Sequence, residues 1–341
     1  MQGIDRDRVS AWLLANIDDV AGPFEFELIV GGRSNLTFLV RDGGGRRLVL
    51  RRPPTGHVLA TAHDMAREHR IISAVGRTAV PVPRTLGLCL DEAVNGAPFY
   101  VMEHVDGVVL DSPARAELLP VELRRPTCEH LVDVLADLHA ADVDEIGLGD
   151  LARREGYVER QIKRWSTQWA NSKTRELPAI DEVARHLVAN VPEQQGVSIA
   201  HGDYRFGNCI TDVGRGRIAA VLDWELCTLG DPLADLGYLG VYWVGSDGTG
   251  RHNDPTSLPG FMSYAEVVDR YARRTGRDVS GIDYYVAFSS WRLAVISEGV
   301  YARYLHGAMG DQVDPEALAL FRVGTEELAV NALEAVRRLA S

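Results

Sequence analysis

The sequence predicts an α+β protein of two lobes, in which a small antiparallel β-rich lobe precedes a larger and mostly helical one. Short β-like runs separated by glycine-rich turns fill the first part of the chain, whereas from about residue 125 the apolar residues recur at helical spacing. A chain of 341 residues is also long enough for two lobes with buried cores. We place the boundary after residue 104, which gives an N-terminal lobe of residues 1–104 and a C-terminal lobe of residues 105–341.

The N-terminal lobe is expected to open with an amphipathic helix over residues 5–18, because apolar side chains recur on one of its faces. A second helix at about 61–75 precedes the last two strands. Asn95 and Gly96 predict the turn between those two strands. The β-like runs of the predicted antiparallel sheet are 24–30, 36–41, 47–51, 85–90 and 98–104.

The C-terminal lobe is dominated by segments with helical periodicity. Ser263, followed three residues later by Glu266, is the capping-box pattern that starts one of them. His139 lies on an apolar helix face, which favours a core or capping role. A short β-rich island at 197–210 and 217–222 interrupts the helices. The predicted helices are 127–140, 153–170, 179–190, 231–243, 263–275, 283–306 and 315–339.

The charge balance argues against several classes of function. The chain carries 36 basic and 48 acidic residues, for a formal net charge of −12. This acidity argues against nucleic-acid partners and against docking on an anionic membrane. Only Lys163 and Lys173 are lysines, so any essential cation is expected to be an arginine.

The N-terminal residues and the cysteines indicate in which cellular compartment the protein is expected. The N-terminus has charges where a signal peptide needs an apolar run, and the scattered cysteines form no metal-binding or disulfide pattern. We therefore expect a reduced, cytoplasmic protein, either a monomer or a homodimer, whose partner is a small molecule.

The densest polar cluster lies in the β-rich island. Asp203 and Asn208 lie five residues apart after an apolar strand, and Asp223 follows the next strand. Carboxylate and amide oxygens are suitable ligands for Mg²⁺, and one carboxylate would remain to orient a hydroxyl nucleophile. Each residue alone is most simply a turn residue, but the set in this order favours a site for phosphoryl transfer.

Three motifs resemble the aminoglycoside phosphotransferase family, a branch of the protein-kinase-like fold. They are His201-Gly202-Asp203-x-x-x-x-Asn208, Val221-Leu222-Asp223-Trp224-Glu225 and Gly230-Asp231-Pro232-x-x-Asp235-Leu236. The resemblance implies a protein-kinase-like two-lobe fold with Asp203 as the catalytic base. It also implies that Asn208 and Asp223 bind Mg²⁺.

The same resemblance assigns supporting roles. Asp235 would brace the catalytic loop together with His201, and Arg205 of the same loop is assigned to catalysis. Within the family, three runs look closest to the phosphotransferase domains associated with acyl-CoA dehydrogenases: Arg51-Arg52-Pro53-Pro54, Tyr100-Val101-Met102-Glu103 and Trp291-Arg292-Leu293.

A glycine-containing loop between the first two strands lies where the resemblance implies a loop that covers the nucleotide. Its backbone N–H groups and polar side chains could bind phosphate oxygens, although a glycine pair between strands is also an ordinary hairpin turn. The residues assigned to nucleotide binding here are Gly32, Ser34, Asn35 and Thr37.

Arg51 ends the third strand, where related kinases carry a lysine that holds the nucleotide phosphates. Glu68 on the following helix is its expected partner, and Arg52 competes for the role. Strand alternation favours Arg51, because Val49 and Arg51 share one face of the strand. The end of the last strand resembles a hinge that meets the adenine edge, and the residues assigned there are Met102, Glu103 and Val105.

The expected activity is transfer of the γ-phosphoryl group of ATP, with Mg²⁺, to a hydroxyl of a small molecule, and GTP stays open as the nucleotide. A nucleotide-binding regulator that kept the fold is the alternative. The acceptor is undetermined, since acidic and basic residues together suit either a polycation or an anionic, acyl-CoA-type molecule. The residues expected in the acceptor pocket are Glu225, Arg292, Glu298 and Tyr301.

Overall fold

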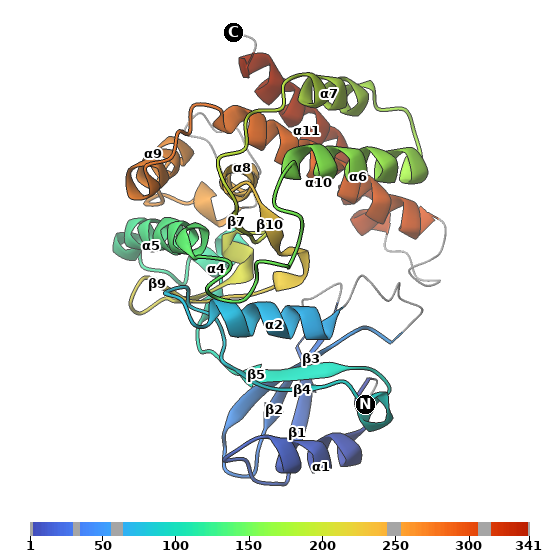
Figure 1. The fold of residues 1–341 in the computed structure, drawn as a ribbon, viewed down its shortest axis with the longest axis vertical. Helices are drawn as coiled ribbons and strands as arrows, with labels where there is room; N and C mark the ends of the chain where they lie inside the picture. Colours follow the sequence, from blue (N-terminus) through green and yellow to red (C-terminus); the bar gives the residue numbers. More distant parts are fainter. Residues whose placement is uncertain (1–2, 30–34, 56–63, 244–253, 306–314, 340–341) are drawn as a thin grey trace.

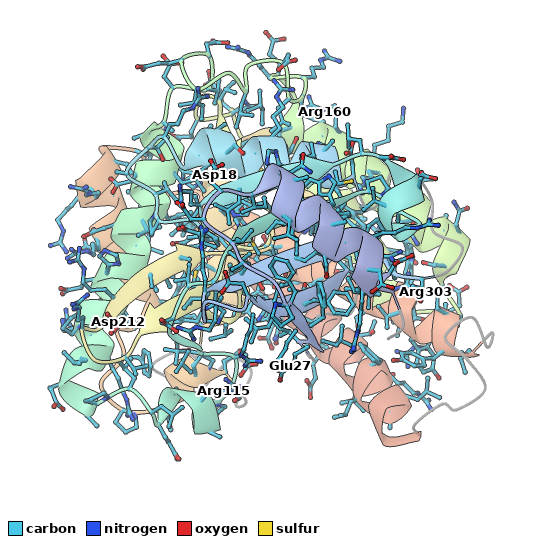
Figure 2. The ribbon with its side chains drawn as sticks, turned by 90° about the horizontal axis from the view of Figure 1, so that it is seen from below. Asp18, Glu27, Arg115, Arg160, Asp212 and Arg303 are labelled. Carbon is cyan, nitrogen blue, oxygen red and sulfur yellow. The ribbon has the colours of Figure 1, made fainter. Side chains whose placement is uncertain are left out.

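The computed structural model describes residues 3–29, 35–55, 64–243, 254–305 and 315–339. The chain forms the two predicted lobes, with the smaller β-rich lobe at the bottom of Figure 1 and the helical lobe above it. The predicted α+β class is therefore confirmed. Figure 2 looks at the molecule from the N-lobe end, with Asp18 and Glu27 of this lobe inside the outline of the view and Asp212 nearer its edge.

The N-lobe is built on an antiparallel sheet in the order β1-β2-β3-β5-β4. The sequence predicted these five strands in an antiparallel sheet, but not that β5 rather than β4 pairs with β3. The predicted turn at Asn95 and Gly96 is the end of a one-turn helix, α3 (Glu92–Asn95), which stops because Gly96 adopts a left-handed φ of 71°. The strands are β1 (Glu25–Leu28), β2 (Leu36–Arg41), β3 (Arg47–Arg52), β4 (Thr85–Cys89) and β5 (Phe99–Glu103).

Two helices cover the two faces of this sheet. Helix α1 (Arg6–Asn16) buries Val9 and Leu13 against one face. Helix α2 (Met65–Val75) lies between the other face and the C-lobe (Figure 1). It begins at Met65, later than the predicted 61, because the Asp64 side chain accepts a hydrogen bond from the Arg67 N–H and caps the helix.

Strand alternation in β3 separates the two cores. Leu48 and Leu50 pack under α1, whereas Val49 points to α2 and joins the large core of the C-lobe. Full burial of each such side chain contributes about 1.5–3 kcal/mol. Arg51 continues the face of Val49, and this alternation therefore aims Arg51 at the C-lobe.

The C-lobe contains each of the predicted helices; α11 has the predicted bounds, and the others differ from the prediction at one or both ends. Helix α5 begins at Val121 rather than at 127, so it contains Pro126, which the prediction placed outside. The turn before the proline is held by Arg124, which is buried and donates to the backbone oxygens of Leu119 and Pro259. The helices are α4 (Pro113–Ala116), α5 (Val121–Ala140), α6 (Tyr157–Ser172), α7 (Pro178–Ala189), α8 (Leu233–Val241), α9 (Tyr264–Thr275), α10 (Ile282–Leu305) and α11 (Pro315–Leu339).

The predicted β-rich island forms two small sheets in the middle of the C-lobe. One pairs β7 (Ser198–Ala200) with β10 (Thr228–Gly230), and the other has the order β6-β8-β9. The strands of the second sheet are β6 (Val108–Val109), β8 (Cys209–Asp212) and β9 (Arg217–Val221). The loops after β7 and β9 carry the predicted catalytic and metal-binding residues.

No helix in the described parts of the chain has the length and apolar character needed to cross a bilayer.

Candidate active site

The loop after β7 is hydrogen-bonded to the side chain of Asp235 in α8. The Asp235 carboxylate accepts hydrogen bonds from the backbone N–H of His201, at 2.6 Å, and of Gly202, at 2.8 Å. The His201 ring in turn binds the backbone oxygen of Leu222 at 3.0 Å, which ties this loop to the one that carries Asp223. The contacts expected of Asp235 and His201 are thus present.

His139 is a supporting residue whose partner was not predicted. Its Nε2 lies 3.3 Å from the Asp235 carboxylate, and its Nδ1 lies 2.7 Å from the Tyr271 hydroxyl. Burial by itself raises the pKa of Asp235, but the hydrogen bond and charge of His139, with the backbone N–H of Gly202, hold the pKa below its usual value. The carboxylate is therefore ionised inside the core.

The loop after β7 arranges donors around Asp203. Asn208 Nδ2 donates to the Asp203 carboxylate at 2.7 Å and to its backbone oxygen at 2.8 Å. Arg205 Nε donates to the other carboxylate oxygen at 3.3 Å, and its guanidinium stacks 4.8 Å from the ring centroid of Tyr242. Because the amide nitrogen of Asn208 binds Asp203, its carbonyl oxygen is the atom left for a cation.

Arg51 bridges the two lobes at Asp223. Its guanidinium lies 2.7 Å from the Asp223 carboxylate, 3.1 Å from Glu68 and 4.0 Å from Glu225. Glu68 is only 2% exposed, and burial raises its pKa despite the opposing charge of Arg51. The predicted pairing of Arg51 with Glu68 is present, and the contact with Asp223 was not predicted.

Asp223 itself adopts a left-handed backbone conformation, with a φ of 64°. This conformation costs a non-glycine residue of order 1–3 kcal/mol and is characteristic of functional sites. Here it turns the chain sharply between β9 and the short 3₁₀ helix Trp224–Leu226, at the point where the carboxylate meets Arg51.

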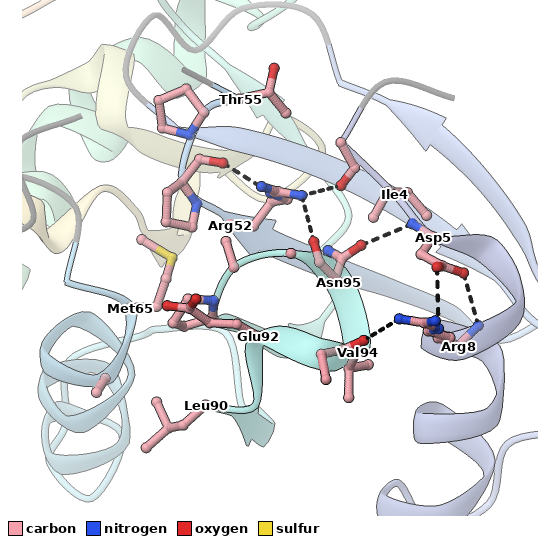
Figure 3. Close-up of a pocket in the computed structure, with 18 of the residues that line it drawn as sticks. Ile4, Asp5, Arg8, Arg52, Thr55, Met65, Leu90, Glu92, Val94 and Asn95 are labelled. Atoms are coloured by element: carbon pink, nitrogen blue, oxygen red, sulfur yellow. Dashed lines mark hydrogen bonds and ion pairs between the residues drawn. The ribbon is translucent and has the colours of Figure 1, made fainter. Parts of the chain in front are cut away.

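Arg52, the competing candidate, points to the other side of the sheet. Figure 3 shows it among the residues that line an N-lobe cavity of about 1090 Å³, where it donates to three backbone oxygens, those of Gly3, Pro53 and Asn95. It is 5% exposed. Apart from Arg52, none of the described residues predicted for the site lines this cavity, so its size does not make it the active site.

The remaining nucleotide-binding candidates lie in the N-lobe at different positions. Gly32 and Ser34 fall outside the described residues. Asn35 is buried and donates to Glu225 across the lobes at 3.3 Å, and Thr37 lies opposite Arg51 in the sheet. Among the residues assigned to this loop, Asn35 and Thr37 are therefore the two that the structure describes, and Thr37 is the register partner of Arg51.

The predicted hinge residues offer mainly backbone atoms. Met102 is a buried core residue, 7% exposed. The Glu103 side chain binds Arg84 at 2.5 Å, and Val105 is half-buried. Any contact of this segment with a base is therefore expected from the main chain rather than from these side chains.

A cleft of about 640 Å³ lies between α2, α6, α10 and the Trp224–Leu226 turn. Glu225 and Arg292 line it, as predicted for an acceptor pocket, but Glu298 and Tyr301 do not. Glu298 is fully buried and accepts hydrogen bonds from Thr174 and Arg175, and Arg175 also covers the ring of Tyr301. The prediction for Glu298 is corrected, because a helix face seen in sequence does not reveal which neighbour it packs against.

Four arginines line this cleft of an acidic chain, together with three carboxylates, Asp64, Glu68 and Glu225. No carboxylate lies within ion-pair distance of the four arginines that line it, in the parts of the chain that the structure describes. The cleft's Glu68 and Glu225 face Arg51 instead. These arginines are Arg67, Arg164, Arg292 and Arg303.

Arg292 connects the cleft to the catalytic loop. It donates to the backbone oxygen of Gly202 at 2.6 Å and lies 4.6 Å above the ring of Tyr238. It is 5% exposed. One end of the cleft therefore lies beside the residue that precedes Asp203.

Known proteins of similar sequence and fold define the class. Residues 25–283 match the sequence profile of the phosphotransferase enzyme family. A protein from Ralstonia eutropha, provisionally described as an aminoglycoside phosphotransferase, has a crystal structure that matches with a TM-score of 0.82 and 33% identity, covering 98% of both chains. The chain thus belongs to the aminoglycoside phosphotransferase family of kinase-like transferases.

Within this family, the chain is similar to a protein from Mus musculus, acyl-CoA dehydrogenase family member 10. It is 36% identical over 292 residues, which cover 84% of this chain and 27% of that protein. The chain thus spans about a quarter of the length of this curated relative. The predicted resemblance to phosphotransferase domains associated with acyl-CoA dehydrogenases is confirmed.

More distant structures share the fold and hold nucleotides. The GDP complex of aminoglycoside 2'-phosphotransferase-IIIa matches with a TM-score of 0.64 at 14% identity, covering 96% of this chain and 99% of that one. The ternary complex of aminoglycoside phosphotransferase APH(4)-Ia with AMP-PNP and hygromycin B matches with a TM-score of 0.59 at 17% identity, covering 95% and 98%. At these identities the likeness concerns the fold alone.

Proposed function

We propose that this protein transfers the γ-phosphoryl group of ATP to a hydroxyl of a small molecule. The observation that carries the proposal is the convergence of Asp203, Asn208 and Asp223 on two loops joined through His201 and Leu222. Phosphoryl transfer needs a positioned nucleophile, a cation and clamps on the phosphates, and these residues with Arg51 supply each part.

The donor atoms fit Mg²⁺, which is commonly held by one or two carboxylates together with substrate phosphates. The Asp223 carboxylate and the Asn208 carbonyl oxygen would hold the ion, which supplies charge neutralisation on the phosphates. Asp203 would take the proton of the acceptor hydroxyl. The hydroxyl oxygen then forms the new bond to the γ-phosphorus, the bond to the bridging oxygen breaks, and ADP leaves.

Arg51 would neutralise negative charge on the phosphates from the N-lobe side, since it already lies between Glu68 and Asp223. The backbone around Glu103 and Val105 would meet the base, and the boundary of the lobes that we propose, after residue 104, lies between these two residues. The same reasoning extends to Arg205, which would stabilise ionised Asp203.

Asp203→Asn tests the assignment of the base. The variant is expected to lose transfer by at least about 100-fold, because general-base catalysis contributes about 10²–10⁴-fold. ATP with Mg²⁺ should still raise its melting temperature, since the cation ligands remain. An Asp203→Asn protein with undiminished transfer would refute the mechanism.

We also propose that the acceptor is anionic. Arg164 and Arg303 are cleft arginines with no carboxylate within ion-pair distance in the described parts of the chain, so a polycation would meet like charge there. The curated relative named above is an acyl-CoA dehydrogenase family member, which makes hydroxylated acyl-CoA thioesters the first acceptors to examine.

A panel of ATP-turnover assays tests this choice. Hydroxyacyl-CoA thioesters and free hydroxy acids are compared with aminoglycosides and hydroxylated amines, and turnover is expected with the anionic acceptors only. Arg303→Ala should raise the acceptor KM about tenfold, which corresponds to about 1.4 kcal/mol. Nucleotide binding without turnover on every acceptor would instead favour a regulator that kept the fold.

A further inference from the structure

Gly299 is an unexpected residue at its position in the fold. It lies inside α10, a helix of 24 residues, where glycine is less favourable than alanine because it loses more backbone entropy on folding. It also lines the cleft between α6 and α10. Glycine inside a helix needs a reason, which is either close packing or space for something else.

Packing does not require this glycine. A Cβ atom at position 299 would lie 3.6 Å from Gln168 Nε2 and 3.7 Å from Ser172 Oγ, both ordinary van der Waals distances. The glycines of α8 are different, because a Cβ at Gly237 would lie 2.5 Å from the Tyr285 backbone and one at Gly240 would lie 2.5 Å from the Tyr264 ring. Those two are needed for packing, and Gly299 is not.

The position of Gly299 along α10 suggests what the space serves. Arg292 marks the catalytic end of the cleft through its bond to Gly202. At 1.5 Å per residue, Gly299 lies about 10 Å further along the helix axis, and Arg303 about 6 Å beyond it. The opposite wall at this point is α6, with Trp165 and Gln168.

We propose that Gly299 determines acceptor specificity by keeping a passage open between α6 and α10 for an elongated acceptor. The molecule would place its hydroxyl at Asp203 and pass Gly299, which lies about 10 Å along the helix axis from Arg292, with its anionic end toward Arg303. This inference rests on the proposed function, since it takes the cleft as the acceptor site. It adds the shape of the acceptor and the residue that admits it.

The test compares two helix-interior glycines. Gly324 lies inside α11, where an added Cβ would meet no atom within 4 Å, and it has no place on the cleft. Alanine at either position is expected to raise the denaturation midpoint, because both helices gain a better helix former. Gly299→Leu should raise the KM of long thioester acceptors at least tenfold, while Gly324→Leu leaves every KM unchanged.

The probes are 3-hydroxybutyrate, which ends before Gly299, and hydroxyacyl-CoA thioesters, which extend past it. In Gly299→Leu the KM is expected to rise for the thioesters and to stay within twofold for 3-hydroxybutyrate and for ATP. An active wild type whose Gly299→Leu variant keeps its thioester KM overturns the inference alone. A lower midpoint for Gly299→Ala overturns it too, because packing would then need the glycine. A wild type inactive on the whole panel contradicts the proposed function as well.

Discussion

Asp235→Asn removes the buried charge that binds the loop after β7, which carries Asp203. The carboxylate accepts from the backbone N–H groups of His201 and Gly202 and binds His139 Nε2. An asparagine keeps one acceptor oxygen and turns an NH₂ group toward a donor. Hydrogen bonds to charged groups are worth about 1.5–3 kcal/mol each, and breaking a buried charged network costs about 3–5 kcal/mol.

The cost can be converted into a melting temperature. With an unfolding entropy of about 2.1 cal/mol/K per residue over 341 residues, a loss of 3–5 kcal/mol lowers the melting temperature by about 4–7 °C. Calorimetry or urea unfolding at pH 7 measures this shift. A loss below about 1 kcal/mol would refute the reasoning, because surface substitutions alone reach ±0.5 kcal/mol.

The difference in stability between wild type and Asp235→Asn is also expected to depend on pH. Because the pKa of Asp235 is below its usual value in the folded protein, its stabilisation is present above the unfolded pKa and is lost as the pH falls through the folded pKa. The stability difference between wild type and Asp235→Asn should therefore shrink in acid, below about pH 4.

Asp231→Asn is the matched control from the same motif. Asp231 is also fully buried, and it accepts from the N–H groups of Gln195 and Leu233 and from the Tyr285 hydroxyl. Burial raises its pKa above the usual value, so wild type should gain stability relative to this variant as the pH falls. The two variants are distinguished by opposite trends, and identical trends would contradict the assigned environments.

Two further substitutions test Arg51 and the corrected acceptor residue. Arg51→Ala should lower the rate of transfer at least about 100-fold, and it should also destabilise the protein because Glu68 loses its buried partner. Arg51→Lys keeps the charge, so its rate in steady-state assays should stay within about tenfold of wild type. Glu298→Gln should lower the unfolding free energy by about 2–3 kcal/mol, because it weakens the buried contacts with Thr174 and Arg175, with the acceptor KM changed less than twofold. A large increase in the acceptor KM would instead show that Glu298 contributes to acceptor binding.

Most of the fold could be predicted because local pattern carries it. Period-two alternation and glycine turns marked the strands of the N-lobe, and helical periodicity marked each long helix. Ends were less predictable: α5 continues through Pro126 because Arg124 is held by Leu119 and Pro259, and Pro259 is distant in sequence.

In the candidate site, too, contacts between residues close in sequence were predictable and long-range contacts were not. The order and spacing of Asp203 and Asn208 pointed to a shared polar site, and the structure joins the two side chains because the loop between them is short and its geometry is local. Their role in phosphoryl transfer stays a prediction. The contact of Asn35 with Glu225 links residues 190 positions apart, and that of His139 with Asp235 links residues 96 apart. No periodic signal marks such pairs.

The family, the two-lobe architecture and the polar residues of the catalytic loops were evident from the amino-acid order alone, because these depend on short-range spacing. The folded chain was needed to show that Arg51 rather than Arg52 faces Asp223, that Glu298 is buried against Arg175, and that four arginines line one cleft of an acidic chain. The physical reason is that net charge sums over all residues, whereas the field in a cleft depends on which few charges the fold brings to its walls.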